Sequence, residues 1–466
     1  MDESIKNVEL ISKKHFVVVF FLFAISYIIP SMKTVISMIG FLLMFSGKVN
    51  YIFMAYSWIN VSTLLSPYYF GYLSTTDTVI RLLSTFLAFL FSFFHYRKIR
   101  SLKNPFFYYQ FIFCVSLIII SLLNFDNDLI SLSLLKIILF FCGSSFAILV
   151  FHLTNKPEKF LSWMIAIFLN LILFSSFSLV FGGSTGFHLG MSSLFQGVFI
   201  HPNKMGIHLI PFLIIFAYYL SLKDKKKYTL ILFLSILLIF YFIYLSGSRG
   251  AISTLAICLI ITFFISLFNK KYITQIKKIF KNSFILLFLL AIISIPFLDL
   301  IFNGFENFFY KGVFDENYSS VEGVFFLSRG WRIMMSYENF LNSPIIGNGF
   351  GTPTEAFVEM NEYYKITYDP IFNFPISAPT EKSFFFIGVL EEIGTVGLLL
   401  FIIYYYKYSK IIIQNSETVF IVALYIYIFI SSMFEFYYFS MGTAAFQWLW
   451  IGYCSKLVLK NKLRIM

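Results

Sequence analysis

Residues 228–268 read YTLILFLSILLIFYFIYL, then SGSRG, then AISTLAICLIITFFISLF. Each apolar run approaches the ~20 residues that an α-helix needs to cross the hydrocarbon core of a bilayer. Arg249 is the only charged residue of the stretch, and it lies in the turn between the runs. This pattern predicts two transmembrane helices that meet at one membrane surface.

Apolar runs of this kind fill most of the chain. Its 466 residues are 59% hydrophobic and only 12% charged, and the mean hydropathy is +0.82. Soluble globular domains carry roughly 25% charged residues, so this composition excludes that class. The sequence predicts an all-α, polytopic transmembrane helix bundle of about 12–14 spans. The runs lie at 16–30, 32–47, 51–66, 78–96, 106–123, 130–152, 160–182, 203–221, 228–245, 250–268, 282–300, 384–406, 417–437 and 441–456.

We expect no cleaved leader, metal or cofactor. The first apolar run, from Phe16, leads directly into further runs and lacks the small-residue cleavage site of a signal peptide. The cysteines all lie in apolar runs without the spacing of a metal site or a disulfide framework, which favours small core residues. They are Cys114, Cys142, Cys258 and Cys454.

The basic residues predict the orientation of the bundle. The formal net charge is +12. Most lysines and arginines lie in short loops and at the termini, as orientation signals do, so we expect no nucleic-acid partner. The positive-inside rule places these segments in the cytoplasm, with both termini inside. They are the two termini and the loops near 48, 97–104, 153–159, 222–227, 269–281 and 407–416.

The opposite membrane face receives the candidate functional segments. It carries the loop 183–202, the turn at 246–249 and the long loop 301–383, in which acids outnumber bases. A loop of this length is usually functional. We therefore expect three parts: a bundle over 1–300, the extracytoplasmic loop over 301–383, and C-terminal spans with a cytoplasmic tail over 384–466.

Three arginines on that face are the leading catalytic candidates. Arg249 opposes the positive-inside bias, and Gly247 and Gly250 beside it allow close backbone approach. Arg329 and Arg332 are three residues apart, so a helical segment would place both on one face. The guanidinium fork matches phosphate oxygens. Alternatively, Arg249 orients its helix and the other two fold the loop through salt bridges.

Five further polar residues are candidates near the same surface. Arg81 and Lys136 lie in the outer parts of their predicted spans, where they either line a substrate cavity or snorkel to the interface. His201 and Asn203 precede the eighth span, and His208 follows on the same helical face. Ionisable residues within spans are functional candidates by default, although a membrane histidine can equally serve a helix-to-helix hydrogen bond. We predict a catalytic role for His201 and substrate binding by the other four.

One carboxylate near this surface is expected to act as general base. A buried carboxylate can accept a proton, or it can pair with one of the arginines. Glu381 lies closest in sequence to the arginine-bearing loop and is the catalytic candidate, with Glu435 assigned to substrate binding. The other candidates are Asp299, Glu391 and Glu392.

Short motifs between about 195 and 400 resemble the bacterial O-antigen polymerase and ligase superfamily, which comprises Wzy-type polymerases and the related O-antigen ligases. Each motif is short, and their order, spacing and shared outer location carry the resemblance. They are FIHPN at 199–203, LSGSRG at 245–250, Ser328-Arg329 with Trp331, PIIGNG at 344–349, and LEEIGTVGL at 390–398.

This resemblance implies a fold related to the GT-C glycosyltransferases and an active site that faces outward from the bacterial cytoplasmic membrane. It implies an oligosaccharide on undecaprenyl diphosphate as donor, and a flippase and a chain-length regulator as possible partners. Ligases of the superfamily typically carry a His-Asn pair just before the span that follows the long loop. Ser383 and Phe384 stand there, and the loop holds no histidine. This departure favours a polymerase, with a ligase as the alternative and a lipid-linked oligosaccharide flippase or exporter as the alternative outside the enzymes.

Overall fold

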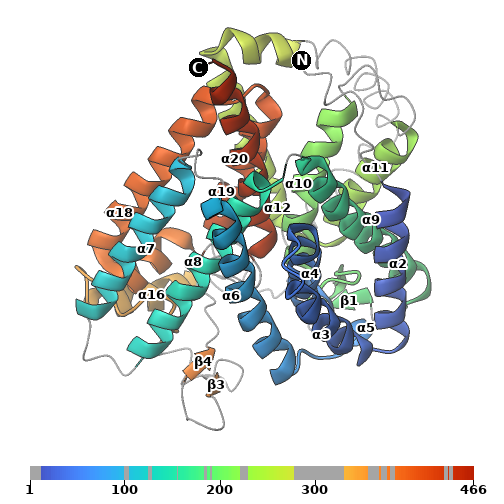
Figure 1. Ribbon diagram of the computed structural model, residues 1–466, viewed down its shortest axis with the longest axis horizontal. Coiled ribbons are helices and arrows are strands. Elements are labelled where there is room, and N and C mark those ends of the chain that lie inside the picture. The colour runs from blue at the N-terminus through green and yellow to red at the C-terminus, as the bar shows by residue number, and fades with distance from the viewer. Residues whose placement is uncertain are drawn as a thin grey trace, which may run out of the picture.

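A computed structural model gives the arrangement of most of the chain (Figure 1). The description covers residues 12–98, 104–123, 129–154, 156–182, 186–188, 191–220, 229–277, 330–354, 367–368, 375–377, 384–434, 439 and 444–465.

The N-terminal part is a series of helices that begin and end close to the predicted spans. They are α2 (Lys13–Ile28), α3 (Met32–Met44), α4 (Val49–Val61), η1 (Ser62–Leu64), α5 (Pro67–Phe70), α6 (Thr75–Lys98), α7 (Pro105–Leu123), α8 (Ile130–His152) and α9 (Pro157–Phe181). An antiparallel hairpin of β1 (Phe187–His188) and β2 (Met191–Phe195) follows α9.

The rest of the described chain continues the bundle. It contains α10 (Pro202–Leu220), α11 (Thr229–Leu245), α12 (Arg249–Leu267), α16 (Trp331–Asn342), α18 (Phe385–Asn415), α19 (Val419–Phe434) and α20 (Ala445–Ile465). A second short antiparallel hairpin joins β3 (Thr367–Tyr368) to β4 (Pro375–Ser377). The segment predicted as a long loop therefore contains a helix and a hairpin.

The helices confirm an all-α polytopic membrane protein. A helix coincides with every predicted span except 282–300, which lies outside the described residues. Six described helices are long and apolar enough to cross a membrane. Others are short: the 13 residues of α3 rise only about 20 Å, against a hydrocarbon core of about 30 Å.

Close packing and buried polar contacts hold the bundle together. Lipid tails are as apolar as leucine, so helices associate in a bilayer through packing and hydrogen bonds rather than through hydrophobic burial. Gln110 of α7 illustrates this, because its amide donates to Ser144 Oγ of α8 at 2.6 Å and accepts from the Tyr404 hydroxyl of α18. Phe168 and Phe212 stack at 3.8 Å between α9 and α10.

The two ends of the bundle differ in what they carry. Figure 1 shows the β1–β2 and β3–β4 hairpins toward the lower end and the C-terminal end of α20 at the upper end. The charge distribution predicts that the end with the hairpins faces outward.

An accessible cysteine near the end of α16 tests this orientation. Asn342 is exposed and the four native cysteines are buried, so we expect Asn342→Cys to react with a membrane-impermeant thiol reagent in intact spheroplasts. The matched control is Glu417→Cys, in the exposed connection between α18 and α19, which should label only after lysis. The reverse labelling pattern would mean that the bundle has the opposite orientation in the membrane, and it would exclude an outward-facing site.

Candidate functional site

α18 is broken at Gly394, and the segment after α16 fills the break. Gly394 has φ +64° and ψ −171°, far from helical values. The carbonyl oxygens of Glu391 and Glu392 therefore lack the amides of the next helical turn. They accept instead from the amides of Asn348 at 2.8 Å and Gly349 at 2.9 Å. Buried carbonyls need such partners, so the loop completes the helix.

The other side of the break is satisfied by the same loop. The amide of Thr395 donates to the carbonyl of Pro344 at 3.0 Å, and the amide of Val396 donates to that of Ile345 at 3.2 Å. The Thr395 hydroxyl also donates to the Pro344 carbonyl at 3.1 Å. Four backbone hydrogen bonds thus join two segments that lie more than 40 residues apart in the sequence.

Glycines make this close approach possible. At Gly394 a Cβ atom would overlap the carbonyl oxygen of Ile345, and at Gly347 (φ +74°) it would overlap the backbone of Glu392. Both residues have positive φ, which other L-residues rarely adopt. We call residues 344–354 together with 391–396 the loop–helix junction.

Two buried carboxylates anchor the junction from within. Glu391 is 0% exposed, and its Oε1 accepts from the side-chain amide of Asn339 at 2.8 Å and from the Thr354 hydroxyl at 2.7 Å. Glu392 is 1% exposed, and its Oε2 accepts from the amide of Gly351 at 2.7 Å. Both glutamates hold the loop against α18.

Lys136 of α8 reaches the same place. Its ammonium donates to the carbonyl of Gly351, while Glu392 accepts from the amide of that residue. The cation predicted to bind substrate is therefore part of the contact between α8 and the loop. It brings positive charge to the candidate site, although the structure gives it a partner within the protein.

The structural role of Glu391 can be separated from a chemical one. Glu391→Gln keeps an oxygen acceptor for Asn339 and Thr354, so we expect membrane protein levels within about twofold of wild type. Glu391→Leu leaves two buried donors unpaired, at roughly 1–3 kcal/mol each, and should accumulate poorly. Immunoblots of membranes measure both, with the exposed Glu417→Gln as control. A Glu391→Gln protein that accumulates normally but is inactive would instead assign the carboxylate to chemistry.

The remaining carboxylate candidates are not described. Asp299, Glu381 and Glu435 lie outside the described residues. The general base predicted at Glu381 and the substrate contact predicted at Glu435 therefore stay predictions.

A second polar cluster lies where α10 and α12 begin. His201 caps α10, since its Nδ1 accepts from the amide of Asn203 at 3.1 Å. In α10, Gly206 lies against the start of α12, where a Cβ atom would come within 2.7 Å of Ser248 Oγ and 2.8 Å of the Ala251 Cβ. The histidine–proline–asparagine motif and the serine–glycine–serine–arginine turn, distant in sequence, thus come together.

Arg249 is the first residue of α12, directly after its N-cap Ser248. Its guanidinium is outside the described part of the chain, but its backbone lies in the first turn of α12. Anionic groups are favoured at a helix N-terminus because unpaired amides and the helix dipole point toward them. Gly247, with φ +56°, turns the chain immediately before this point.

The other predicted arginines have different surroundings. Arg329 lies outside the described residues, and α16 begins at Trp331, so its place on a shared helical face with Arg332 stays a prediction. The Arg332 guanidinium carbon lies 5.3 Å from the centre of the Trp331 ring, a cation–π distance. Arg81 lies in α6 one turn after Asp77, whose Oδ2 accepts from the Ser74 hydroxyl at 2.9 Å, and a substrate contact at Arg81 stays a prediction.

His208 is buried in α10, with 2% of its surface exposed. Its Nε2 has no hydrogen-bond partner among the described residues. A substrate contact at His208 stays a prediction. Within the described part of the chain, no group of three or more His, Cys, Asp or Glu residues could hold a metal ion.

One helix packs against the elements of both clusters. α19 contacts α10 and α12, which carry the second cluster, and α18, which carries the loop–helix junction. The sequence predicted functional residues in both the loop–helix junction and the second polar cluster. It did not predict the contact between residues 344–349 and 391–396. Nor did it predict that Asn339 and Thr354 donate to Glu391, because polar residues are frequent in this segment and nothing in the sequence singles these two out.

Residues 234–402, which include α12 and the whole loop–helix junction, match a family model described as O-antigen ligase. The match confirms the resemblance to the O-antigen polymerase and ligase superfamily. It covers the segment that bears Arg249, Arg329, Arg332 and Glu381. No curated protein matches the chain.

Proposed function

We propose that this protein is a glycosyltransferase of the bacterial cytoplasmic membrane that polymerises oligosaccharide units at the outer surface. The donor is an oligosaccharide on undecaprenyl diphosphate, and the acceptor is a sugar of a second lipid-linked unit. The observation that carries the proposal is the loop–helix junction within the segment that matches the O-antigen ligase family. It fixes α16, and with it Arg332, against α18.

Glycosyl transfer needs a base for the acceptor hydroxyl, an electrophilic anomeric carbon, and groups that stabilise negative charge on the leaving diphosphate. The acceptor hydroxyl attacks the anomeric carbon of the donor, the new glycosidic bond forms, and the bond to the diphosphate breaks. The hydroxyl proton passes to a carboxylate, which we assign to Glu381. Negative charge collects on the leaving diphosphate, where preorganised donors are most effective. We assign that role to Arg249, Arg329 and Arg332.

A ligase is the second candidate, because the matching family carries that description. It would use the same donor and transfer finished polymer to a different acceptor. The absence of histidine from residues 301–383 favours the polymerase, since the related ligases typically carry one there. An exporter is less well supported. A transporter should carry charges along a whole translocation path, whereas the candidate charges of this chain lie near one membrane surface.

Deletion of the gene, followed by chain-length analysis of surface polysaccharide and of lipid-linked intermediates, tests the proposal. A polymerase predicts surface chains of a single repeat unit, restored to full length by the wild-type gene. Uncapped polymer that stays on the lipid carrier would instead identify a ligase, and lipid-linked units that build up in the cytoplasmic leaflet would identify an exporter.

A further inference from the structure

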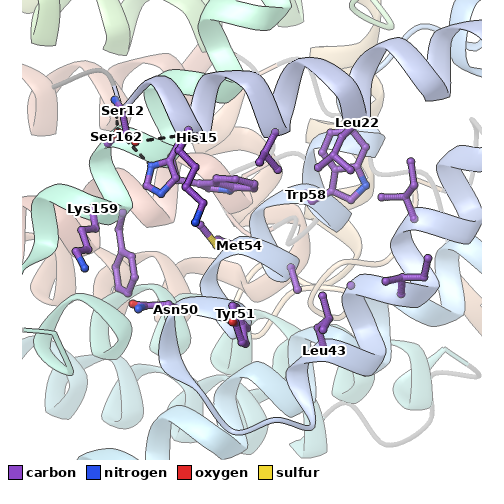
Figure 2. Close-up of a pocket in the computed structure, with 18 of the residues that line it drawn as sticks. Ser12, His15, Leu22, Leu43, Asn50, Tyr51, Met54, Trp58, Lys159 and Ser162 are labelled. Carbon is purple, nitrogen blue, oxygen red and sulfur yellow. Dashed lines mark hydrogen bonds between the residues drawn. The ribbon is translucent and has the colours of Figure 1, made fainter. Parts of the chain in front are cut away.

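A cavity of about 1060 Å³ lies among α2, α3, α4 and α9 (Figure 2). Lys136 near the start of α8 contacts the loop–helix junction, whereas α9, which follows the end of α8, begins at the cavity, so the two sites lie toward opposite ends of α8. From α2 it is lined between Lys14 and Leu22, and from α3 between Ile36 and Leu43. The turn at residues 29–31, which joins these helices, does not line it. The cavity therefore lies toward the ends remote from that turn, which the basic residues predict to be cytoplasmic.

The body of the cavity is apolar. Several of its side chains face open space rather than a neighbouring helix: Val18 is 43% exposed, Ile39 52% and Leu43 48%. Leu22, Met54 and Trp58 continue this surface (Figure 2). Walls of this kind at membrane depth suit hydrocarbon. The volume is slightly above the roughly 300–1,000 Å³ usual for small-molecule pockets.

The mouth of the cavity is cationic. Among the described residues, Lys14, Lys156 and Lys159 line it beside one acid, Glu158. All three lysines are exposed, so their ammonium groups can turn toward a ligand at the surface. The N-termini of α2, α4 and α9 also lie here, where the helix dipole favours an anion.

Polar contacts order one wall of the mouth. Ser162 Oγ of α9 accepts from the amide of Ser12 at 3.0 Å and lies 3.2 Å from Nδ1 of His15, as the dashed lines of Figure 2 show. The His15 ring packs edge-on against Trp163 at 5.7 Å. The start of α2 is thereby fixed to α9, so the lysines are presented from a rigid frame.

We propose that this cavity binds one anionic phospholipid of the leaflet at the predicted cytoplasmic surface. Its phosphate lies among Lys14, Lys156 and Lys159, and one acyl chain fills the apolar body. A free anion would leave the apolar walls uncovered, and a neutral lipid would leave the lysines without a counter-charge. The site is separate from the proposed glycosyl transfer and does not depend on it.

Native mass spectrometry of the full-length protein in detergent tests this, with phosphatidylglycerol, phosphatidylcholine and inorganic phosphate as probes. We expect one phosphatidylglycerol per protein, bound at least about tenfold more tightly than phosphatidylcholine. Each surface lysine contributes roughly a fivefold factor, so the double variant Lys156→Gln, Lys159→Gln should bind phosphatidylglycerol about 25-fold more weakly. The matched control, Lys407→Gln with Lys410→Gln on exposed positions of α18, should change nothing.

A measurement on the unmodified chain keeps the proposal testable if a variant misfolds. Trp58 and Trp163 line the cavity, so phosphatidylglycerol with brominated acyl chains should quench tryptophan fluorescence, and Trp58→Phe should reduce the quenched fraction. The proposal is overturned by equal binding of the two phospholipids, or by unchanged binding in the double lysine variant. Displacement by inorganic phosphate alone, or a preference for undecaprenyl phosphate over phosphatidylglycerol, would also overturn the assigned occupant.

Discussion

Gly394→Ala is expected to remove the protein from the membrane almost completely. At φ +64° and ψ −171°, a backbone region essentially restricted to glycine, alanine costs roughly 1–3 kcal/mol, and its Cβ would also overlap the carbonyl oxygen of Ile345. Relief of that overlap separates α18 from residues 344–349 and breaks backbone hydrogen bonds on both sides of the kink. We expect a total above about 3 kcal/mol and a fall in membrane protein of at least about tenfold. Quantitative immunoblots after matched expression measure it.

Gly40→Ala is the matched control. Gly40 lies in α3, and a Cβ atom there would make ordinary contact with Ala55 at 3.6 Å. This variant should accumulate normally. Gly347→Ala should reproduce the defect from the other side of the contact, because its Cβ would overlap the backbone of Glu392. Normal levels and protease resistance of both Gly394→Ala and Gly347→Ala would mean that the loop–helix junction does not hold the outer segment in place.

The sequence predicts the membrane spans well for a simple physical reason. A helix in lipid must be apolar along its whole length, so each span appears in the sequence as one continuous apolar run. The helix α8, predicted at 130–152, occupies Ile130–His152. The short helices α3 and α4 show the limit, because hydropathy gives the length of an apolar run but not where the helix within it ends.

The loop–helix junction could not be predicted in the same way. Its hydrogen bonds join backbone groups of residues 344–349 and 391–396, and a backbone group has no signature in the sequence. The glycines of PIIGNG at 344–349 and LEEIGTVGL at 390–398 permit unusual backbone conformations, but nothing in either motif identifies the other as its partner. Glu391 and Glu392 were indistinguishable from catalytic carboxylates on sequence alone, because burial and a hydrogen-bond donor are required in either role.

The arginines give the second large expected effect. Arg249→Lys and Arg329→Lys should each abolish detectable polymer while the protein still accumulates in the membrane. Arginine makes charge-assisted, often bidentate hydrogen bonds to phosphate oxygens, whereas lysine supplies a point charge. Loss of one such donor from a preorganised site lowers turnover by about 10²–10³. For Arg249 the start of α12 adds a second source of positive potential that the substitution leaves intact. Any slow activity that remains in Arg249→Lys would measure the contribution of the helix N-terminus.

Complementation of a deletion strain, with membrane protein levels measured in parallel, distinguishes a diphosphate site from a structural one. Arg332→Lys should be milder if Arg332 serves to fold the outer segment rather than to bind the diphosphate, because an ammonium can keep the cation–π contact that the guanidinium makes with the Trp331 ring. Arg97→Lys, at the predicted cytoplasmic end of α6, should complement fully, since only its charge serves orientation. If Arg249→Lys and Arg329→Lys also complement like wild type, planar donors are not needed at either position. The negative charge of the leaving group must then be met elsewhere, and Lys136, whose ammonium donates to the Gly351 carbonyl at the loop–helix junction, is a cation to examine next.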